Sequence, residues 1–217
     1  MKISKEKIID ASWKLLRDEG IEGFSMRKLA ERLDAQAASL YYYFKNKQSI
    51  FQVLADQVAQ EALITTNIDA NWKEQINEFS FNLYNNLKLY PCSAQLLMQT
   101  LPLERNYLTL INCLLSIIDK VRISEQNKFT AAICVLNYVI SFELDRYEQT
   151  KINKTMEKEG INAKELFRQA IESMEGMHTS VLQRIFQNQF LSQMGSDQMF
   201  QTGLNILILG IEQLSNE

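Results

Sequence analysis

The apolar residues of this chain recur every three or four positions, the spacing that places them on one face of an α-helix. Near the N-terminus, Ile8, Ala11, Leu15 and Leu16 form such a stripe. The pattern predicts eleven helices, at about 4–19, 26–33, 36–44, 46–66, 71–90, 93–101, 103–120, 124–150, 162–174, 179–193 and 197–214. Because no segment alternates apolar and polar residues as a strand would, we expect an all-α fold.

Helix-capping and helix-breaking residues support these boundaries. Side chains that favour the N-cap position begin four of the helices, at Ser4, Ser25, Asn46 and Ser124. Gly20 follows the first helix, and Pro91 and Pro102 stop two of the later ones. The polar residues 151–160 predict a mobile link after the long helix at 124–150.

Composition and charge refine this picture. Only 7 Gly and 2 Pro occur in 217 residues, as expected for helices joined by few tight turns. The net charge of −3 is unevenly placed, because residues 1–47 carry ten Lys/Arg against seven Asp/Glu, and residues 48–217 carry thirteen against nineteen. Salt limits the reach of each charge to about 10 Å, so the basic head can bind phosphate although the whole chain is acidic.

The remaining compositional signals concern the compartment. Cys92, Cys113 and Cys134 show no metal-binding spacing, and we expect reduced thiols that pack as small apolar side chains. The N-terminus has no apolar signal segment, and the most apolar stretch, 204–214, is too short to span a bilayer. These features predict a cytoplasmic protein without membrane contact.

Residues 25–47 carry the most informative pattern. Two short helices joined by a tight turn have the length of a helix-turn-helix, whose second helix enters the major groove, about 12 Å wide. Small residues at the start of that helix allow a close approach to the base edges: Ala35, Ala37, Ala38 and Ser39. Leu40 and Phe44, four positions apart, share the face that binds the core.

The tyrosines that follow bear on whether this hairpin binds anything. Tyr41, Tyr42 and Tyr43 cannot all face one core, because adjacent helical residues point about 100° apart. At least one is therefore exposed beside Lys45 and Lys47, and exposed aromatic groups next to lysines favour a binding face. A small helical hairpin with an aromatic face is the alternative that periodicity alone leaves open.

The runs GFSMRKLAERL and SLYYYFKNK resemble the TetR family of bacterial repressors, over about residues 4–60. The resemblance implies a three-helix DNA-binding domain at 1–47, helix 46–66 as a linker, and a ligand-binding and dimerisation domain at 48–217. It also implies DNA contacts at nine positions: Ser25, Arg27, Gln36, Ala37, Ser39, Tyr41, Tyr42, Tyr43 and Lys47. Of these, Tyr43 and Lys47 would clamp phosphates. In the turn, Asp34 replaces the usual glycine, and aspartate tolerates left-handed geometry better than most residues.

Residues 72–102, with the later runs SFELDRYEQ and FQTGLNILILGIEQL, resemble the core domain of tetracycline repressors. The antibiotic ligands of that domain do not carry over, because its drug-contacting and magnesium-binding positions are mostly apolar here and only Asp145 retains an acid. One carboxylate is too few ligands for a chelated divalent ion, so we predict no metal site, no cofactor and no tetracycline–magnesium binding. The residues expected around a pocket for a hydrophobic small-molecule effector are Phe79, Leu83, Leu97, Leu101, Cys113, Tyr138 and Asp145. Apolar residues at this spacing are equally compatible with ordinary core.

The helices at 124–150 and 197–214 are apolar on more than one face, which requires burial on two sides. Pairing with the same helices of a second copy would provide it, and the resemblance implies such a homodimer. Gly203 and Gly210 would let these helices approach closely. A homodimer presents two recognition helices to a palindromic operator. We therefore predict a transcriptional repressor released by an effector, with helix 46–66 as the lever between head and body.

Other functions stay open at this point. An enzyme is disfavoured, because no nucleophile–base–acid set or phosphate loop is evident and the single histidine, His178, is more typical of a solvated side chain than of a ligand. A helical adaptor could bind a protein through the aromatic face. A DNA-binding head could also serve an activator, or a regulator that acts without a ligand.

Overall fold

The computed structural model describes residues 3–63, 69–173, 180–187 and 193–215. In this part of the chain it contains eleven helices and no strand, which confirms the all-α fold. The helices are α1 (Lys5–Gly23), α2 (Met26–Arg32), α3 (Ala37–Tyr41), α4 (Lys47–Ala62), α5 (Trp72–Leu87), α6 (Ser93–Gln99), α7 (Arg105–Ile118), α8 (Glu125–Lys158), α9 (Ala163–Glu172), α10 (Ser180–Gln187) and α11 (Asp197–Leu214). The predicted His178 lies outside the described residues.

The predicted caps form as expected. The side chains of Ser4, Ser25, Asn46 and Ser124 each accept a hydrogen bond from a backbone N–H in the first turn of the following helix. Asn46 does so within a capping box completed by Ser49. Gly20 leaves helical geometry inside α1 with φ 68°, and Asp34 adopts the left-handed φ of 48° in the turn between α2 and α3. Asp34 thus takes the place that glycine fills most easily.

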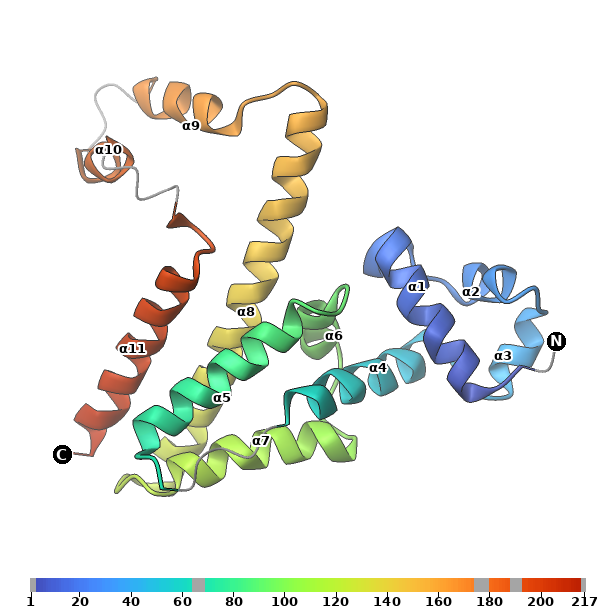
Figure 1. Ribbon diagram of the computed structural model, residues 1–217, viewed down its shortest axis with the longest axis horizontal. Helices are drawn as coiled ribbons and strands as arrows, with labels where there is room; N and C mark the ends of the chain where they lie inside the picture. Colours follow the sequence, from blue (N-terminus) through green and yellow to red (C-terminus); the bar gives the residue numbers. More distant parts are fainter. Residues whose placement is uncertain (1–2, 64–68, 174–179, 188–192, 216–217) are drawn as a thin grey trace.

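The predicted mobile link at 151–160 is wrong, because α8 continues through Lys158. These residues include no glycine or proline before Gly160, and lysine, glutamate and methionine are good helix formers. Figure 1 shows the end of α8 projecting beyond the body before the chain turns into α9. The polarity of these turns therefore reflects their solvent exposure rather than a loss of helix. In contrast, α4 ends at Ala62, earlier than predicted.

The helices form a small head and a larger body (Figure 1). Helices α1–α3 lie at one end, and α4 runs from them into the body, where it packs against α5, α6 and α7. Helix α11 lies along α8, and both contact α5. Aromatic rings join these three helices, since Tyr84 of α5 stacks on Phe200 of α11 with 4.2 Å between ring centroids and Phe142 of α8 meets Phe200 edge-on. The body is thus one continuous core to which the head is attached.

Gly203 allows the close approach of α8 and α11 within one chain. A methyl group added there would overlap the Tyr138 hydroxyl group, which donates a 2.8 Å hydrogen bond to the Phe200 carbonyl. We expect Gly203→Ala to lower the free energy of unfolding by about 1–3 kcal/mol through overpacking, more than its gain in helix propensity of about 1 kcal/mol. Urea unfolding followed by circular dichroism measures this.

Gly210→Ala is the matched control, because a methyl group at Gly210 meets nothing within 4 Å in the chain. This variant should unfold at the wild-type urea concentration or slightly above it. Equal destabilisation by both substitutions would contradict the packing argument for Gly203.

The cysteines are only partly as expected. Cys92 is buried and Cys113 half-buried, but Cys134 lies exposed on α8, so the prediction of a packed thiol is wrong there. Burial raises the pKa of the Cys92 and Cys113 thiols, which keeps both protonated near neutral pH. Among the described helices, none has the length and apolarity needed to cross a bilayer.

Candidate DNA interface and effector site

Ion pairs and buried side chains attach the second and third helices to the rest of the head. Lys28 of α2 pairs with Glu19 at 2.7 Å and Arg32 with Asp18 at 2.6 Å, so α2 is tied to α1 by two ion pairs. On α3, Leu40 is fully buried and Phe44, just beyond the helix, is nearly so. This confirms that the two apolar residues four positions apart face the core. The opposite side of α3 is consequently turned outward.

The outward side of α3 carries most of the residues predicted to read DNA. Gln36, the N-cap residue, makes no capping hydrogen bond through its side chain, and both Gln36 and Ser39 are exposed. Tyr41 is 51% exposed and Tyr42 is 85% exposed, whereas Ala37 is half-buried. An 85% exposed aromatic ring contributes nothing to the core. The face is therefore polar, aromatic and accessible.

Tyr43 has a contact that the sequence did not suggest. Its hydroxyl group donates a 2.8 Å hydrogen bond to the Ile3 carbonyl, and its ring meets Tyr42 edge-on at 5.1 Å. A phenol has one proton to donate, and a phosphate oxygen only accepts. The predicted phosphate contact of Tyr43 therefore requires the bond to Ile3 to break. Tyr43 holds the N-terminal segment against α3 instead.

The other predicted phosphate and anchoring residues flank this face. The Ser25 hydroxyl oxygen caps α2 by accepting a 3.2 Å hydrogen bond from the Lys28 N–H, and its own proton can still be donated to a phosphate. Arg27 is exposed and pairs with Glu31 at 3.4 Å, a surface ion pair of the kind worth about 0–1 kcal/mol and easily exchanged. Lys47 is exposed, with its ammonium group 5.1 Å from the centre of the Phe51 ring. Arg27 and Lys47 can therefore bind a phosphate without a change in the fold of the head.

The residues predicted around an effector pocket are not gathered around a cavity. Phe79, Leu83 and Leu97 are buried in the core, and Cys113 is half-buried beside it. The Tyr138 hydroxyl group donates a hydrogen bond to the Phe200 carbonyl of α11. Leu101 is 65% exposed, and Asp145 is exposed on α8. None of the seven lines the cavity between head and body described below or the open surface hollow beside Leu103 and Leu108. The predicted pocket stays a prediction and would need the core to open.

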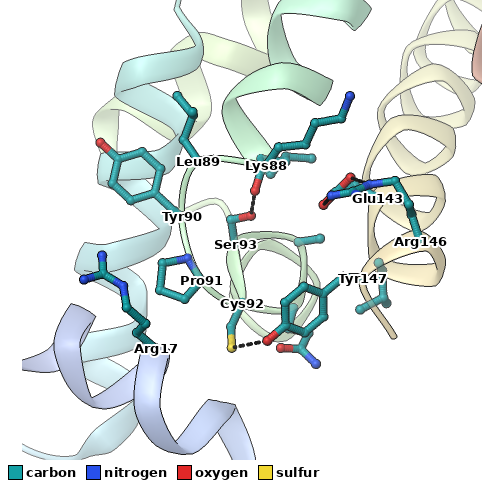
Figure 2. A pocket seen from close by; sticks show the side chains of 14 residues that line it. Arg17, Lys88, Leu89, Tyr90, Pro91, Cys92, Ser93, Glu143, Arg146 and Tyr147 are labelled. Carbon is teal, nitrogen blue, oxygen red and sulfur yellow. Dashed lines mark hydrogen bonds and ion pairs between the residues drawn. The ribbon is translucent and has the colours of Figure 1, made fainter. Parts of the chain in front are cut away.

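A cavity of about 180 Å³ lies where the head meets the body (Figure 2). Its walls come from Arg17 of α1, from the segment that connects α5 to α6, and from one side of α8. The buried Glu143 carboxylate forms one wall and accepts two 2.6 Å hydrogen bonds from Arg146. Sequence reasoning missed this place, because its residues are up to 130 positions apart and share no motif.

The head also contacts the body directly beside this cavity. The Trp13 ring of α1 packs on Tyr90 at 5.0 Å, and its indole N–H donates to the Gln57 side chain of α4 at 3.0 Å. Cys92 lies between the two parts, with its sulfur atom 3.8 Å from the Leu16 carbonyl. On the other side of α4, Asp56 accepts hydrogen bonds from two backbone N–H groups at the start of α7. The head and the body are thus joined by two sets of contacts, one made directly by α1 and one made through α4.

Comparison with known proteins identifies the family to which this fold belongs. Residues 8–54 match the family description "Bacterial regulatory proteins, tetR family", and residues 66–215 match "Tetracyclin repressor-like, C-terminal domain". The second match alone covers more than half of the chain. The chain belongs to the TetR family. It is a DNA-binding transcriptional regulator with a helix-turn-helix, as the family resemblance of residues 4–60 implied.

Individual relatives agree with the assignment to the TetR family. A tetracycline repressor of class G from Vibrio anguillarum is 26% identical over 215 residues, which is 98% of this chain and 95% of that protein. A transcriptional regulator of helix-turn-helix type from Saccharopolyspora erythraea is 30% identical over 64% of this chain, which spans 58% of that protein. The structure of ActR from Streptomyces coelicolor with actinorhodin superimposes with a TM-score of 0.77 at 20% identity, covering 100% of both chains. At 20% identity, the likeness to ActR shows a shared fold.

In this TetR-family protein, Leu97 stands where the resemblance to tetracycline repressors places their magnesium-binding histidine, and Leu101 stands where it places a neighbouring arginine; both are hydrocarbon side chains. Neither can bind a cation. Asp145 accepts a 2.8 Å hydrogen bond from Gln149 on the surface of α8. Within the described residues, no three His, Cys, Asp or Glu side chains gather closely enough to hold a metal ion.

Proposed function

We propose that this regulator is a homodimeric repressor that binds a palindromic operator through two copies of α3 and leaves it when a small molecule binds. The observation that carries the proposal is the outward face of α3, where Tyr42 is 85% exposed while Leu40 and Phe44 hold the helix from behind. An exposed aromatic group on a rigid helix of the TetR head has a ready partner in the major groove. We assign the base contacts to Gln36, Ala37, Ser39, Tyr41 and Tyr42, and the DNA-backbone contacts to Ser25, Arg27 and Lys47. Tyr43 is not among them, because its hydroxyl group donates its proton to the Ile3 carbonyl.

Dimerisation is proposed through the outward faces of α8 and α11. On α11, Ile206 and Leu209 are exposed and three positions apart, so they share a face. On α8, Phe129 is exposed in the same way. Large apolar side chains exposed along two neighbouring helices are typical of a surface that another protein covers. A second copy of the chain supplies the matching surface and gives the two-fold symmetry that a palindrome requires.

The two sets of contacts between head and body support the proposed release by an effector. A small molecule that binds one body conformation better than another shifts the separation of the two heads, and operator affinity falls by the same differential affinity. ActR, which has the same fold, is known in a complex with actinorhodin. The effector of the present protein is proposed to be a small molecule with an apolar body.

Selection from random duplex DNA, followed by gel shifts at rising salt, tests the proposal. We expect selected sequences to be inverted repeats. Affinity should fall by about 10³–10⁵-fold between 50 and 200 mM salt if six to ten phosphates are contacted. Recovery of no preferred sequence, or of an asymmetric single site, would contradict a symmetric repressor.

A further inference from the structure

The cavity between head and body has a wall that is unevenly charged. Arg17, Lys88 and Arg146 contribute three positive groups, and Glu143 one negative group. Glu143 is neutralised by Arg146, and the Lys88 ammonium group is held by Asp197 at 3.1 Å. Among the described residues, Arg17 has no carboxylate within ion-pair distance. Figure 2 shows it extending from α1 to a position beside Pro91. The cavity therefore has an unpaired cation at its head side.

Two further polar side chains of the wall, Tyr147 and Gln95, differ in what they offer a ligand. Burial raises the pKa of Tyr147 to about 12, so its hydroxyl group keeps its proton at neutral pH. The atom beside this hydroxyl group is the Cys92 sulfur at 3.8 Å, which is only a weak acceptor. Gln95 donates its amide N–H to the Glu148 carboxylate at 2.5 Å, which fixes the orientation of the amide because a carboxylate only accepts. The Gln95 amide oxygen is then buried with no partner, and because it only accepts it would not bind a carboxylate. The Tyr147 hydroxyl group is the polar group that can donate to one.

The rest of the wall is apolar. Leu89, Pro91 and Leu144 line it together with the Tyr90 ring. An apolar cavity of about 150 Å³ holds benzene. A cavity of about 180 Å³ with one cationic wall therefore has room for a ring of that size and one carboxylate.

We propose that this cavity binds a small carboxylate with an apolar body, about the size of benzoate, and that its carboxylate pairs with Arg17. The site is separate from the core residues expected around an effector pocket. The inference rests on the proposed function for its regulatory consequence only. Because Arg17 belongs to the head and the rest of the wall to the body, a ligand that bridges them changes the angle at which the head is held and weakens operator binding.

Calorimetry with sodium benzoate on the full-length protein, without DNA, tests the site. We expect a dissociation constant on the order of 1 mM, as is usual for a ligand of so few atoms. Arg17→Gln should weaken binding about ten-fold or more, because it removes a charge-assisted hydrogen bond. Benzamide, a neutral molecule of the same shape, should bind the wild type about ten-fold more weakly than benzoate.

Lys14→Gln is the matched control, since Lys14 is exposed on the same helix and lies outside the cavity. It should bind benzoate as the wild type does. No binding of benzoate, equal binding by Arg17→Gln, or equal binding of benzamide would overturn the proposed site. Thermal unfolding of Arg17→Gln separates a lost contact from a lost fold, because a folded variant keeps the wild-type midpoint.

A gel shift with the selected operator tests the regulatory half. Benzoate should weaken operator binding by the wild type and by Lys14→Gln but leave Arg17→Gln unaffected. Unchanged operator affinity at saturating benzoate would overturn the coupling. Failure of the wild type to bind any operator without benzoate would instead overturn the proposed function, so the two failures are distinguishable.

Discussion

Ile206→Glu is expected to convert the dimer into monomers and to lower operator affinity by about 10²–10⁴-fold, the gain that linking two binding heads provides. Ile206 is 65% exposed in the single chain, so the substitution leaves the fold of the monomer intact. In a dimer the same position would bury a carboxylate against apolar side chains without a partner, which costs several kcal/mol. Light scattering coupled to size-exclusion chromatography measures the mass, and a gel shift measures the affinity.

Thr109→Glu is the control for the added charge. Thr109 is exposed on α7, which is not one of the two helices of the proposed interface, so the Thr109→Glu variant should remain dimeric with wild-type affinity. Leu207 would be a poor choice for the test, because it is half-buried against the body and a glutamate there would disturb the fold itself. A dimeric Ile206→Glu variant with unchanged operator affinity would exclude α11 from the interface.

Local signals explain why so much of the fold is predictable from the sequence. Caps such as Ser25 and Asn46 satisfy backbone N–H groups of their own helix, so their effect depends on residues only three positions away. The pair Leu40 and Phe44 likewise identifies the buried side of α3 from spacing alone. Once that side is known, the exposure of Tyr42 follows from helix geometry. The helix-turn-helix was therefore accessible from short-range patterns.

The features that were not predictable depend on contacts between distant residues. The hydrogen bond from the Tyr43 hydroxyl group to the Ile3 carbonyl joins residues 40 positions apart, and neither residue type predicts it. The end of α8 is helical although its residues are polar. These residues are good helix formers and extend a helix that has already begun, so they need no apolar face against a neighbour. Leu101 was expected in a pocket, but the turn before α7 leaves it exposed. Periodicity shows that a residue is apolar, not which helix it meets.

Of the features that depend on contacts between distant residues, the cavity beside Arg17 is the clearest example. It is assembled from α1, from the connection between α5 and α6, and from α8. Its charge balance depends on two ion pairs, Glu143–Arg146 within α8 and Lys88–Asp197 with α11. In the sequence, Arg17 is one of many exposed basic residues on a helix. Only the arrangement in space distinguishes it from Lys14, three positions earlier, which is why the two make a matched pair of variants.

Tyr42→Ala is expected to lower operator affinity by about 30- to 1,000-fold, because each of two heads loses a contact worth about 1–2 kcal/mol. The ring is 85% exposed, so its removal should change the free energy of unfolding by no more than about 0.5 kcal/mol. Tyrosine is uncharged, and the slope of affinity against salt should therefore stay as in the wild type. Gel shifts at several salt concentrations measure both quantities.

Lys47→Gln provides the contrast, since an exposed lysine that meets a phosphate releases counterions when it binds. Its loss should weaken binding to all sequences alike and reduce the salt slope by about one per head. Tyr42→Phe separates the ring from the hydroxyl group: retained affinity would assign the contact to the ring face and a thymine methyl group, whereas the loss seen with alanine would assign it to the hydroxyl group. If Tyr42→Ala bound the operator as tightly as the wild type, the assignment of Tyr42 to the major groove would be wrong, although it is the most exposed ring on the outward face of α3.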